Sequence, residues 1–185
     1  MPHNFDNFPT LHTERLDLIE VTSVHTADLF ALVTDKRVSR FFNVFPATHE
    51  SEMEKVVERI RNMYAGKTGI RWGIQLKGTA NIIGTIGYYN LTDKHRGVLA
   101  YALIPEYWRK GYVGESLNEV LRFGFEKLDL RRIDAEIRPG NVASENALMK
   151  YGFLHEGLLR QWTLWNGEYQ DMNMYSLLAN EWRNR

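Results

Sequence analysis

The chain contains no cysteine among its 185 residues. Disulfide bonds, thiolate-bound metals, iron–sulfur clusters and cysteine nucleophiles are therefore excluded. Covalent catalysis through a thioester on the protein is excluded with them.

Long apolar runs, an excess of charge of one sign and paired histidines are also missing. No apolar stretch approaches the roughly 18 residues of a membrane span, and none follows a basic start as in a signal peptide. The 23 lysine and arginine residues balance 23 aspartate and glutamate residues, so we expect no nucleic-acid or membrane partner. The six histidines have no metal-ligand spacing, so we expect no metal. The expected location is the cytoplasm.

What is present is the composition of a folded globular protein. Hydrophobic residues make up 44% of the chain and charged residues 25%, which argues against disorder. Chains usually divide into domains only above about 250 residues. We therefore expect one domain over residues 1–185, with a flexible start at residues 1–10.

The apolar spacing predicts both helices and strands. Thr48 is expected to cap the second helix and Gly66 to end it. The predicted helices are 26–33, 48–66, 115–128 and 144–151, and the predicted strands are 15–21, 72–76, 82–89, 98–104, 132–138 and two runs around Asn166-Gly167 that end with 172–178.

The connections between these elements predict a mixed α/β sheet. The almost wholly apolar run 98–104 suits a strand covered on both faces. A helix follows it and leads to strand 132–138, and such a crossover joins parallel strands. Asn166-Gly167 is a strong signal for a two-residue hairpin, and 172–178 is expected to close the sheet.

The segment 104–115 links this buried strand to a helix and combines glycines with cations. The first turn of a helix has unpaired N–H groups and a positive dipole end. Gly111 and Gly114 permit close backbone approach, and Arg109 and Lys110 add positive charge. These features favour a phosphate site. The alternative is a tight turn with two solvated cations, and the spacing matches neither the P-loop nor the dinucleotide motif.

A second candidate loop, 138–146, follows the next strand. Asn141 lies after a Pro-Gly turn and three residues before Ser144, which is the spacing of a helix N-cap. Both loops lie at the carboxyl ends of neighbouring parallel strands, where open α/β sheets bind ligands. Capping and ligand binding are both open for Asn141.

Taken in order, these segments resemble the Gcn5-related N-acetyltransferases (GNAT), and most closely their RimJ/RimL branch. The resemblance runs from about Leu11 to the end. It is carried by Gly84-Thr85-Ile86-Gly87, Tyr101 to Pro105, Tyr107-Trp108-Arg109-Lys110-Gly111-Tyr112, Asn141-Val142-Ala143-Ser144, Lys150-Tyr151-Gly152-Phe153, Glu156-Gly157, Arg160, Asn166-Gly167, Asp171, Tyr175-Ser176-Leu177-Leu178 and Glu181-Trp182.

The resemblance implies one mostly antiparallel mixed sheet, flanked by helices, with a central parallel pair of strands that splay apart. It also implies transfer of an acetyl group from acetyl-CoA to a primary amine by direct attack. Pantetheine would pair with the strand like an added strand. The implied acetyl-CoA residues are Leu103, Ile104, Arg109, Lys110, Gly111, Tyr112, Val113, Gly114, Glu115, Asn141 and Ser144.

Several positions depart from the family pattern. Val113 stands where a second Gly or Ala is usual, and Leu148 replaces a tyrosine that protonates the departing thiolate in many relatives. Ser144 is the substitute acid. No glutamate lies within the run 98–100, so no general base is evident. Glu136 either serves as the base through water or is a solvated strand carboxylate.

The acceptor amine is open at this level. The leading interpretation is a protein N-terminal amine, as in ribosomal-protein acetylation. A small amine such as a polyamine or an aminoglycoside would require converging carboxylates, for which Glu50, Glu52, Glu54 and Asp93 are candidates. A third interpretation is a noncatalytic acyl-CoA-binding regulatory module. A homodimer through the C-terminal strands is a further expectation.

Overall fold

The computed structural model describes residues 7–43, 47–92, 95–165 and 167–183. They form one eight-stranded sheet with the order β1-β2-β3-β4-β5-β6-β8-β7. The strands are β1 (Leu11–His12), β2 (Leu16–Glu20), β3 (Ile70–Leu76), β4 (Ile82–Thr92), β5 (Arg96–Leu103), β6 (Arg132–Ile137), β7 (Leu154–Trp165) and β8 (Glu168–Leu178). The helices are α1 (Thr26–Thr34), α2 (Lys36–Ser39), α3 (Met53–Ala65), α4 (Tyr112–Glu126), α5 (Val142–Lys150) and α6 (Ala179–Arg183).

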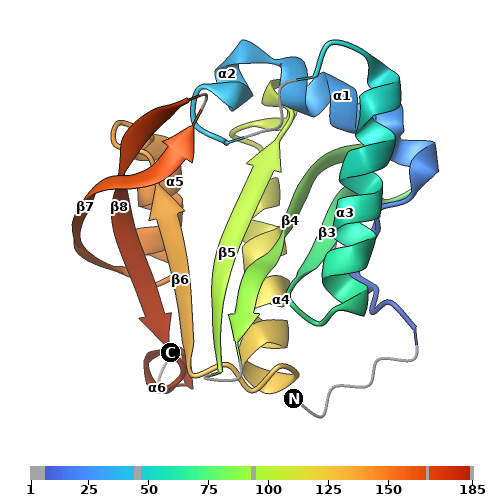
Figure 1. The fold of residues 1–185 in the computed structure, drawn as a ribbon. Coiled ribbons are helices and arrows are strands. Elements are labelled where there is room, and N and C mark those ends of the chain that lie inside the picture. The colour runs from blue at the N-terminus through green and yellow to red at the C-terminus, as the bar shows by residue number, and fades with distance from the viewer. Residues whose placement is uncertain (1–6, 44–46, 93–94, 166, 184–185) are drawn as a thin grey trace.

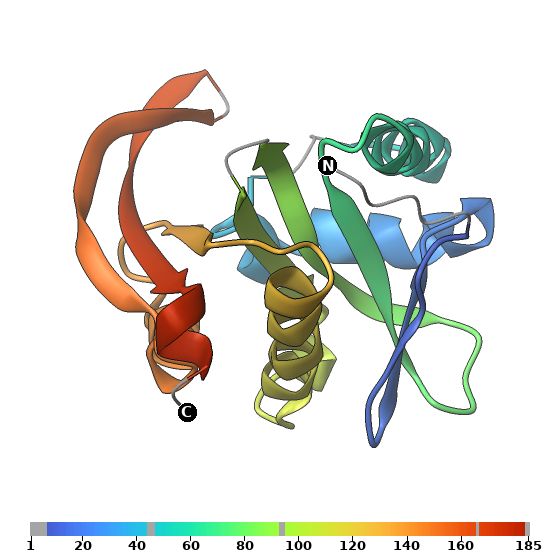
Figure 2. The ribbon, with the colours of Figure 1, turned by 90° about the horizontal axis from the view of Figure 1, so that it is seen from below.

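The pairing confirms the predicted fold class. Strands β5 and β6 are parallel, and the other six neighbouring pairs in the described sheet are antiparallel. α4 lies behind the sheet in Figure 1 and α3 lies in front of it. Figure 2 shows the same two helices on opposite sides of the central strands. The result is a mixed sheet between two helical layers.

Each helical layer has its own apolar core. Behind the sheet, Leu117 and Val120 of α4 are fully buried, and the Tyr88 hydroxyl donates to the Val120 carbonyl at 2.8 Å. In front, Val57 and Ile60 of α3 belong to a second cluster with residues of α1 and β4. α3, which corresponds to the predicted helix 48–66, is amphipathic as predicted, because the apolar residues that repeat every three to four positions form its buried face.

Strands β5 and β6 are paired only along part of their length. Their register runs from Arg96 opposite Arg132 to Leu99 opposite Ala135. Beyond this point β5 continues to Leu103 and β6 to Ile137. The two strands diverge toward their carboxyl ends (Figure 1), so the splayed parallel pair implied by the resemblance is present.

Three expected boundaries differ from the structure. α4 begins at Tyr112 rather than at 115, because Gly111 with φ 83° already turns the chain into the helix. Thr48 caps no helix, since a 3-10 turn at Glu50–Glu52 with His49 at its N-cap precedes α3. Strand β8 lies between β6 and β7, so β7 rather than 172–178 is the edge of the sheet.

Residues 7–10 pack onto the sheet instead of forming part of a flexible start. The Phe8 ring lies 5.0 Å from the Tyr64 ring and 6.0 Å from the Trp72 ring, centroid to centroid. The Trp72 indole donates to the Pro9 carbonyl at 2.7 Å. Residues 1–6 lie outside the described part of the chain, as does Asn166 of the predicted hairpin turn.

The C-terminal strands form a long hairpin that curves away from the rest of the sheet (Figure 2). The register between β7 and β8 shifts twice, between His155 and Gly157 and between Leu159 and Thr163. Such bulges increase the bend and twist of a strand pair. None of the helices among the described residues is long and apolar enough to cross a membrane.

Candidate functional site

The amino end of α4 presents backbone N–H groups at the splayed end of the sheet. The first bond of this helix to the carbonyl four residues earlier runs from the Glu115 N–H to the Gly111 carbonyl at 3.0 Å. The N–H groups of Tyr112, Val113 and Gly114 precede this bond and have no acceptor within the helix. Together with the positive end of the helix dipole, they form a site suited to an anion.

Glu115, one of the expected acetyl-CoA residues, uses both its backbone N–H and its side chain in hydrogen bonds within the protein. The Thr13 hydroxyl donates to Glu115 Oε1 at 2.5 Å, and the Arg15 backbone N–H donates to the same atom at 2.7 Å. Arg15 Nη2 lies 2.7 Å from Glu115 Oε2. Glu115 therefore fastens the start of β2 to α4, and its carboxylate is neutralised by Arg15.

Two arginines outside the motif hold the loop before α4. Arg15 Nη1 donates to the Lys110 carbonyl at 3.0 Å, and its guanidinium stacks over the Tyr112 ring at 4.6 Å. On the other side, Arg37 Nη2 donates to Glu106 Oε1 at 2.9 Å. The loop is thus fixed from α2 and from β2, which preorganises its backbone.

The two cations of the motif are exposed at this loop. Arg109 has a left-handed backbone with φ 60°, which is uncommon for a residue other than glycine. The Lys110 ammonium lies 5.3 Å from the centre of the Tyr107 ring. Both side chains extend into solvent next to the N–H groups of α4, where they add positive charge to the anion site.

Gly114 allows α5 to approach α4. A Cβ atom at this position would lie 3.0 Å from the Tyr151 hydroxyl oxygen, at the end of α5. Burial, followed by the charge of Glu115, raises the pKa of Tyr151. A side chain at position 114 would therefore require the Tyr151 ring to shift.

The amino end of α5 confirms the predicted capping role of Asn141. Its Oδ1 atom accepts a hydrogen bond from the Ser144 backbone N–H at 3.3 Å. Within the described part of the chain, the Ser144 hydroxyl has no hydrogen-bond partner. The Tyr101 hydroxyl donates to the Ser144 carbonyl at 3.5 Å, and burial raises the pKa of Tyr101 to about 12. Leu148 is fully buried.

The end of β5 is partly occupied by the protein's own groups. The Ile104 N–H donates to the Ile83 carbonyl at 2.9 Å, and the Ile104 carbonyl accepts from the Tyr107 N–H at 3.0 Å. The Trp108 indole donates to the Leu103 carbonyl at 2.7 Å. Because a carbonyl has two lone pairs, the Leu103 carbonyl retains one further acceptor position. The Ile104 N–H is used, but by the same count its carbonyl also retains one acceptor position.

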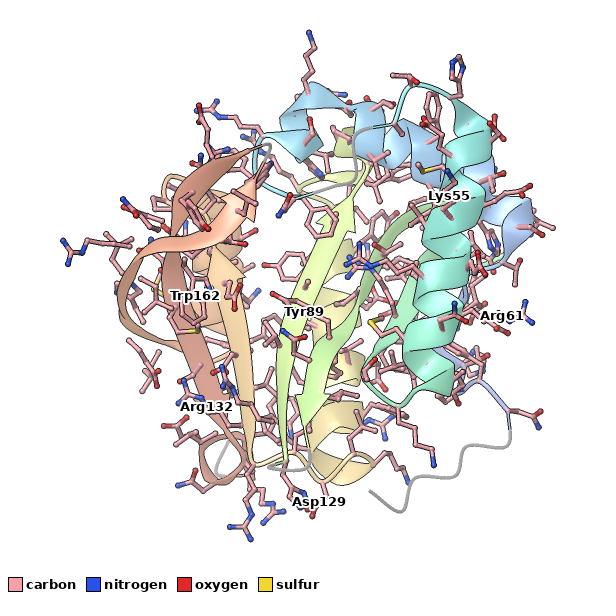
Figure 3. All side chains as sticks on the ribbon, viewed as in Figure 1. Lys55, Arg61, Tyr89, Asp129, Arg132 and Trp162 are labelled. Carbon is pink, nitrogen blue, oxygen red and sulfur yellow. The ribbon has the colours of Figure 1, made fainter. Side chains whose placement is uncertain are left out.

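Glu136 lies on the front face of the sheet, one residue beyond the last pair between β5 and β6. The Tyr89 hydroxyl donates to Glu136 Oε2 at 3.3 Å. Burial, followed by the Glu136 charge, raises the pKa of Tyr89, which keeps the phenol protonated. Figure 3 shows Tyr89 in the middle of this face, between α3 and the β7–β8 hairpin. Glu136 is half-buried and hydrogen-bonded rather than fully solvated.

Two of the acidic residues expected for a polyamine site are engaged within the chain. Glu50 accepts from the Thr26 hydroxyl at 3.2 Å, and Glu52 accepts from the N–H groups of Thr48 and His49. Asp93 lies outside the described residues. In the described ranges, no three histidine, aspartate or glutamate side chains are grouped to hold a metal ion.

The sequence singled out the α4 loop, Asn141, Ser144 and Glu136, and the structure places all of them at the splayed end. It did not single out Arg15 or Arg71, and it considered Tyr89 only as one of several aromatic residues that could line the acceptor cleft. Arg15 and Glu115 are 100 residues apart in the sequence, and only the tertiary fold brings them together. The alternation of Thr85, Gly87 and Tyr89 along β4 could have predicted that Tyr89 lies on the same face as Thr85 and Gly87, because every second residue of a strand points to the same side.

Comparison with known proteins agrees with this geometry. Residues 15–154 match the family model described as an acetyltransferase (GNAT) domain. The chain is 37% identical over 172 residues to the N-acetyltransferase YoaA of Bacillus subtilis, covering 92% of this chain and 97% of that protein. It is 22% identical over 171 residues to a ribosomal-protein-serine acetyltransferase of Escherichia coli, covering 91% and 95%.

Among solved structures, RimJ of Mycobacterium smegmatis in complex with CoA-disulfide superposes with a TM-score of 0.83 at 20% identity, covering 94% of this chain and 89% of that one. This likeness concerns the fold. The family match covers most of the chain and includes the splayed strands and the start of α4. The protein is therefore a member of the GNAT family, an N-acetyltransferase of the kind that uses acetyl-CoA.

Proposed function

We propose that this enzyme acetylates the N-terminal amine of a protein substrate by direct attack on acetyl-CoA at the splayed end of β5 and β6. The observation that carries the proposal is the meeting of two helix starts at this end. α4 contributes free N–H groups and α5 contributes Ser144, while Glu136 lies on the opposite face. An anion site and two proton-transfer groups thus border one opening in the sheet.

The residues of the α4 loop fit the pyrophosphate of acetyl-CoA. The N–H groups of residues 112–114 point along the helix axis toward the loop. At Gly111, a Cβ would lie 3.2 Å from Arg15 Nη2, so the lack of a side chain there lets Arg15 lie close to the loop. Arg109 and Lys110 add long-range attraction for the phosphates. Leu103 and Ile104 each offer a remaining carbonyl position to the pantetheine amide, whereas the Ile104 N–H is taken up by Ile83 of the sheet.

Acetyl-CoA supplies an activated thioester carbonyl when it is bound. The chain's own groups then move protons. Glu136, held by Tyr89, accepts the proton of the attacking amine through a water molecule, and the Ser144 hydroxyl donates toward the thiolate leaving group. A free thiol has a pKa near 8.5, so assistance from Ser144 is modest. Placement of the two reactants supplies most of the rate.

The choice of acceptor rests on two points. Two of the carboxylates that a polyamine would need, Glu50 and Glu52, are already hydrogen-bonded within the chain. The similarity to a ribosomal-protein-serine acetyltransferase supports a protein N-terminus, and we propose that the enzyme acts in the cytoplasm, where such substrates are made.

Mass spectrometry of acetylated products tests this proposal. The enzyme is incubated with acetyl-CoA and a panel of N-terminal peptides, polyamines and aminoglycosides. We expect acetylation of the α-amine of peptides and none of the small amines. Acetylation of a polyamine alone would overturn the choice of acceptor. Tight binding of acetyl-CoA with no product from any acceptor would instead identify a regulatory module.

We also propose that the enzyme forms a homodimer through the edge strand β7. The hairpin carries exposed large apolar side chains at Leu154, Leu158, Trp162, Leu164 and Tyr169. An unpaired strand edge with apolar side chains favours association. Trp162 projects from the hairpin in Figure 3. Light scattering should give a dimer mass for the native chain and a monomer mass for Trp162→Glu.

A further inference from the structure

Arg71 of β3 is a half-buried cation with no carboxylate partner among the described residues. Its Nε atom donates to the Thr85 hydroxyl at 3.1 Å, and its guanidinium stacks on the Phe42 ring at 5.2 Å. Its Nη2 atom is buried and has no hydrogen-bond partner in the described part of the chain. The side chain as a whole is half-buried, so solvent reaches part of it.

The arginines around the α4 loop and at the base of the sheet behave differently. Arg15, Arg37 and Arg132 each lie within 2.7 Å of a carboxylate oxygen. Burial lowers the pKa of Arg71 to about 10, which leaves it charged at neutral pH. The buried Nη2 donor of Arg71 is unsatisfied, and such a donor requires an explanation. The explanation that fits its location is an anion supplied from outside the chain.

The residues that follow Arg71 across the sheet toward Glu136 are small. Arg71 is paired with Gly87 of β4, and Gly87 is paired with Ala100 of β5. Glu136 follows in β6, one residue beyond the pair of Leu99 and Ala135. These residues share the front face, because directly paired positions point to the same side of a sheet. Two small residues therefore separate a cation from a carboxylate.

The glycine in this row is fixed by packing. A Cβ at Gly87 would overlap the backbone of Ile70 and Arg71. The Arg71 side chain reaches Thr85, which lies two residues before Gly87 on β4. Tyr89 lies on the same face and connects this region to Glu136. The arrangement complements a molecule with an amine at one end and a carboxylate at the other.

We propose that Arg71 binds a carboxylate of the acceptor while the acceptor amine lies toward Glu136. This inference rests on the proposed acetyl transfer, and it defines the acceptor as an amine that also carries an acidic group. The carboxylate belongs either to an acidic side chain near a peptide N-terminus or to a free amino acid. A polycation is disfavoured, since Arg71 would repel it.

Equilibrium binding of matched probes tests the proposal without turnover. Calorimetry is done in the presence of CoA with Ser-Asp-Gly-Gly amide against Ser-Asn-Gly-Gly amide, and with glutamate against glutamine. In at least one pair, we expect the carboxylate member to bind at least tenfold tighter. The pair that shows the preference identifies the source of the carboxylate. Arg71→Met should reduce this preference to less than twofold.

Two further variants serve as controls. Arg61→Met removes an exposed arginine that projects outward from α3 (Figure 3) and should keep the preference. Arg71→Lys keeps the charge but not the planar fork, and should keep only part of the preference. Thermal melts test whether each variant folds. If Arg71→Met does not fold, the partial loss of the carboxylate preference in Arg71→Lys is the result that tests the proposal.

The proposal is overturned if neither pair shows a preference, or if the preference survives in Arg71→Met. A failure of the proposed function gives a different result. In that case the preference depends on Arg71, and yet no acetylated product forms from any of the four probes.

Discussion

The two ends of the β5–β6 pair are built in opposite ways. At the start of the pair, Asp134 is fully buried and bonded to both Arg96 and Arg132, and Arg132 Nη2 lies 2.5 Å from Glu156. At the other end, the strands separate and helix starts replace strand pairing. At one end, ion pairs join β5, β6 and β7. At the other end, the backbone N–H groups at the start of α4 have no acceptor within the helix and can bind a ligand. Residues that stabilise the fold and residues that bind ligand thus lie at opposite ends of the β5–β6 pair.

The largest expected effect is at the ion-paired end. Asp134→Asn leaves Arg96 and Arg132 without their shared carboxylate, and breaking a buried pair costs about 3 kcal/mol. Chemical denaturation should show this loss in the free energy of unfolding, and Tm should fall by about 10 °C. The folded fraction should bind acetyl-CoA normally. A weakened affinity with unchanged stability would contradict the division between the two ends.

The next effect is at the open end. Gly111→Trp fills the space beside the N–H groups of α4, and calorimetry should show at least tenfold weaker binding of acetyl-CoA, about 1.4 kcal/mol. Gly78→Trp is the matched control. Gly78 has φ 80°, close to the 83° of Gly111, and its Cβ would meet nothing within 4 Å. If both variants bind equally well, the α4 loop is not the phosphate site.

Ser144→Ala separates chemistry from capping at the start of α5. The cap bond joins the Asn141 side chain to the Ser144 backbone, so alanine at position 144 keeps it. We expect kcat to fall about tenfold with little change in KM for acetyl-CoA, because the hydroxyl meets negative charge only as the thiolate forms. Steady-state kinetics measure this change.

Asn141→Ala is the companion variant. It should lower stability by about 1 kcal/mol through loss of the cap. An unchanged kcat in Ser144→Ala would leave the enzyme without an identified acid.

The smallest expected effect is a pH dependence at the ion-paired end. Hydrogen bonds from Arg132 and then from Ser176 lower the pKa of Glu156 to about 2. A carboxylate with a lowered pKa stabilises the fold above its unfolded pKa and loses that contribution as pH falls toward the folded value. Between about pH 5 and pH 2, the native chain should lose about 1 kcal/mol more stability than Glu156→Gln. Parallel melting profiles of the two proteins would contradict this.

The sequence predicted the sheet and most of the open end, because these depend on local patterns. The helix–strand alternation indicated the crossover, and Asn141 was recognisable as a cap from its spacing to Ser144. The start of α4 was placed at 115 rather than 112, because the tyrosine, valine and glycine of its first turn are weak helix formers. Burial of Asp134 was not predicted, since its alternation with the apolar Ile133 and Ala135 is typical of an outward side chain. Arg96 of the neighbouring strand and Arg132, two residues earlier, cover it.

The indole of Trp108 gives the open end an optical signal of its own. It is 41% exposed and bonded to the Leu103 carbonyl, where a pairing ligand would have to lie. A molecule that enters there changes the polarity and the hydrogen bonding around the ring. The emission spectrum of the native chain, minus that of Trp108→Phe, would therefore follow occupancy of the site without any label or coupled reaction.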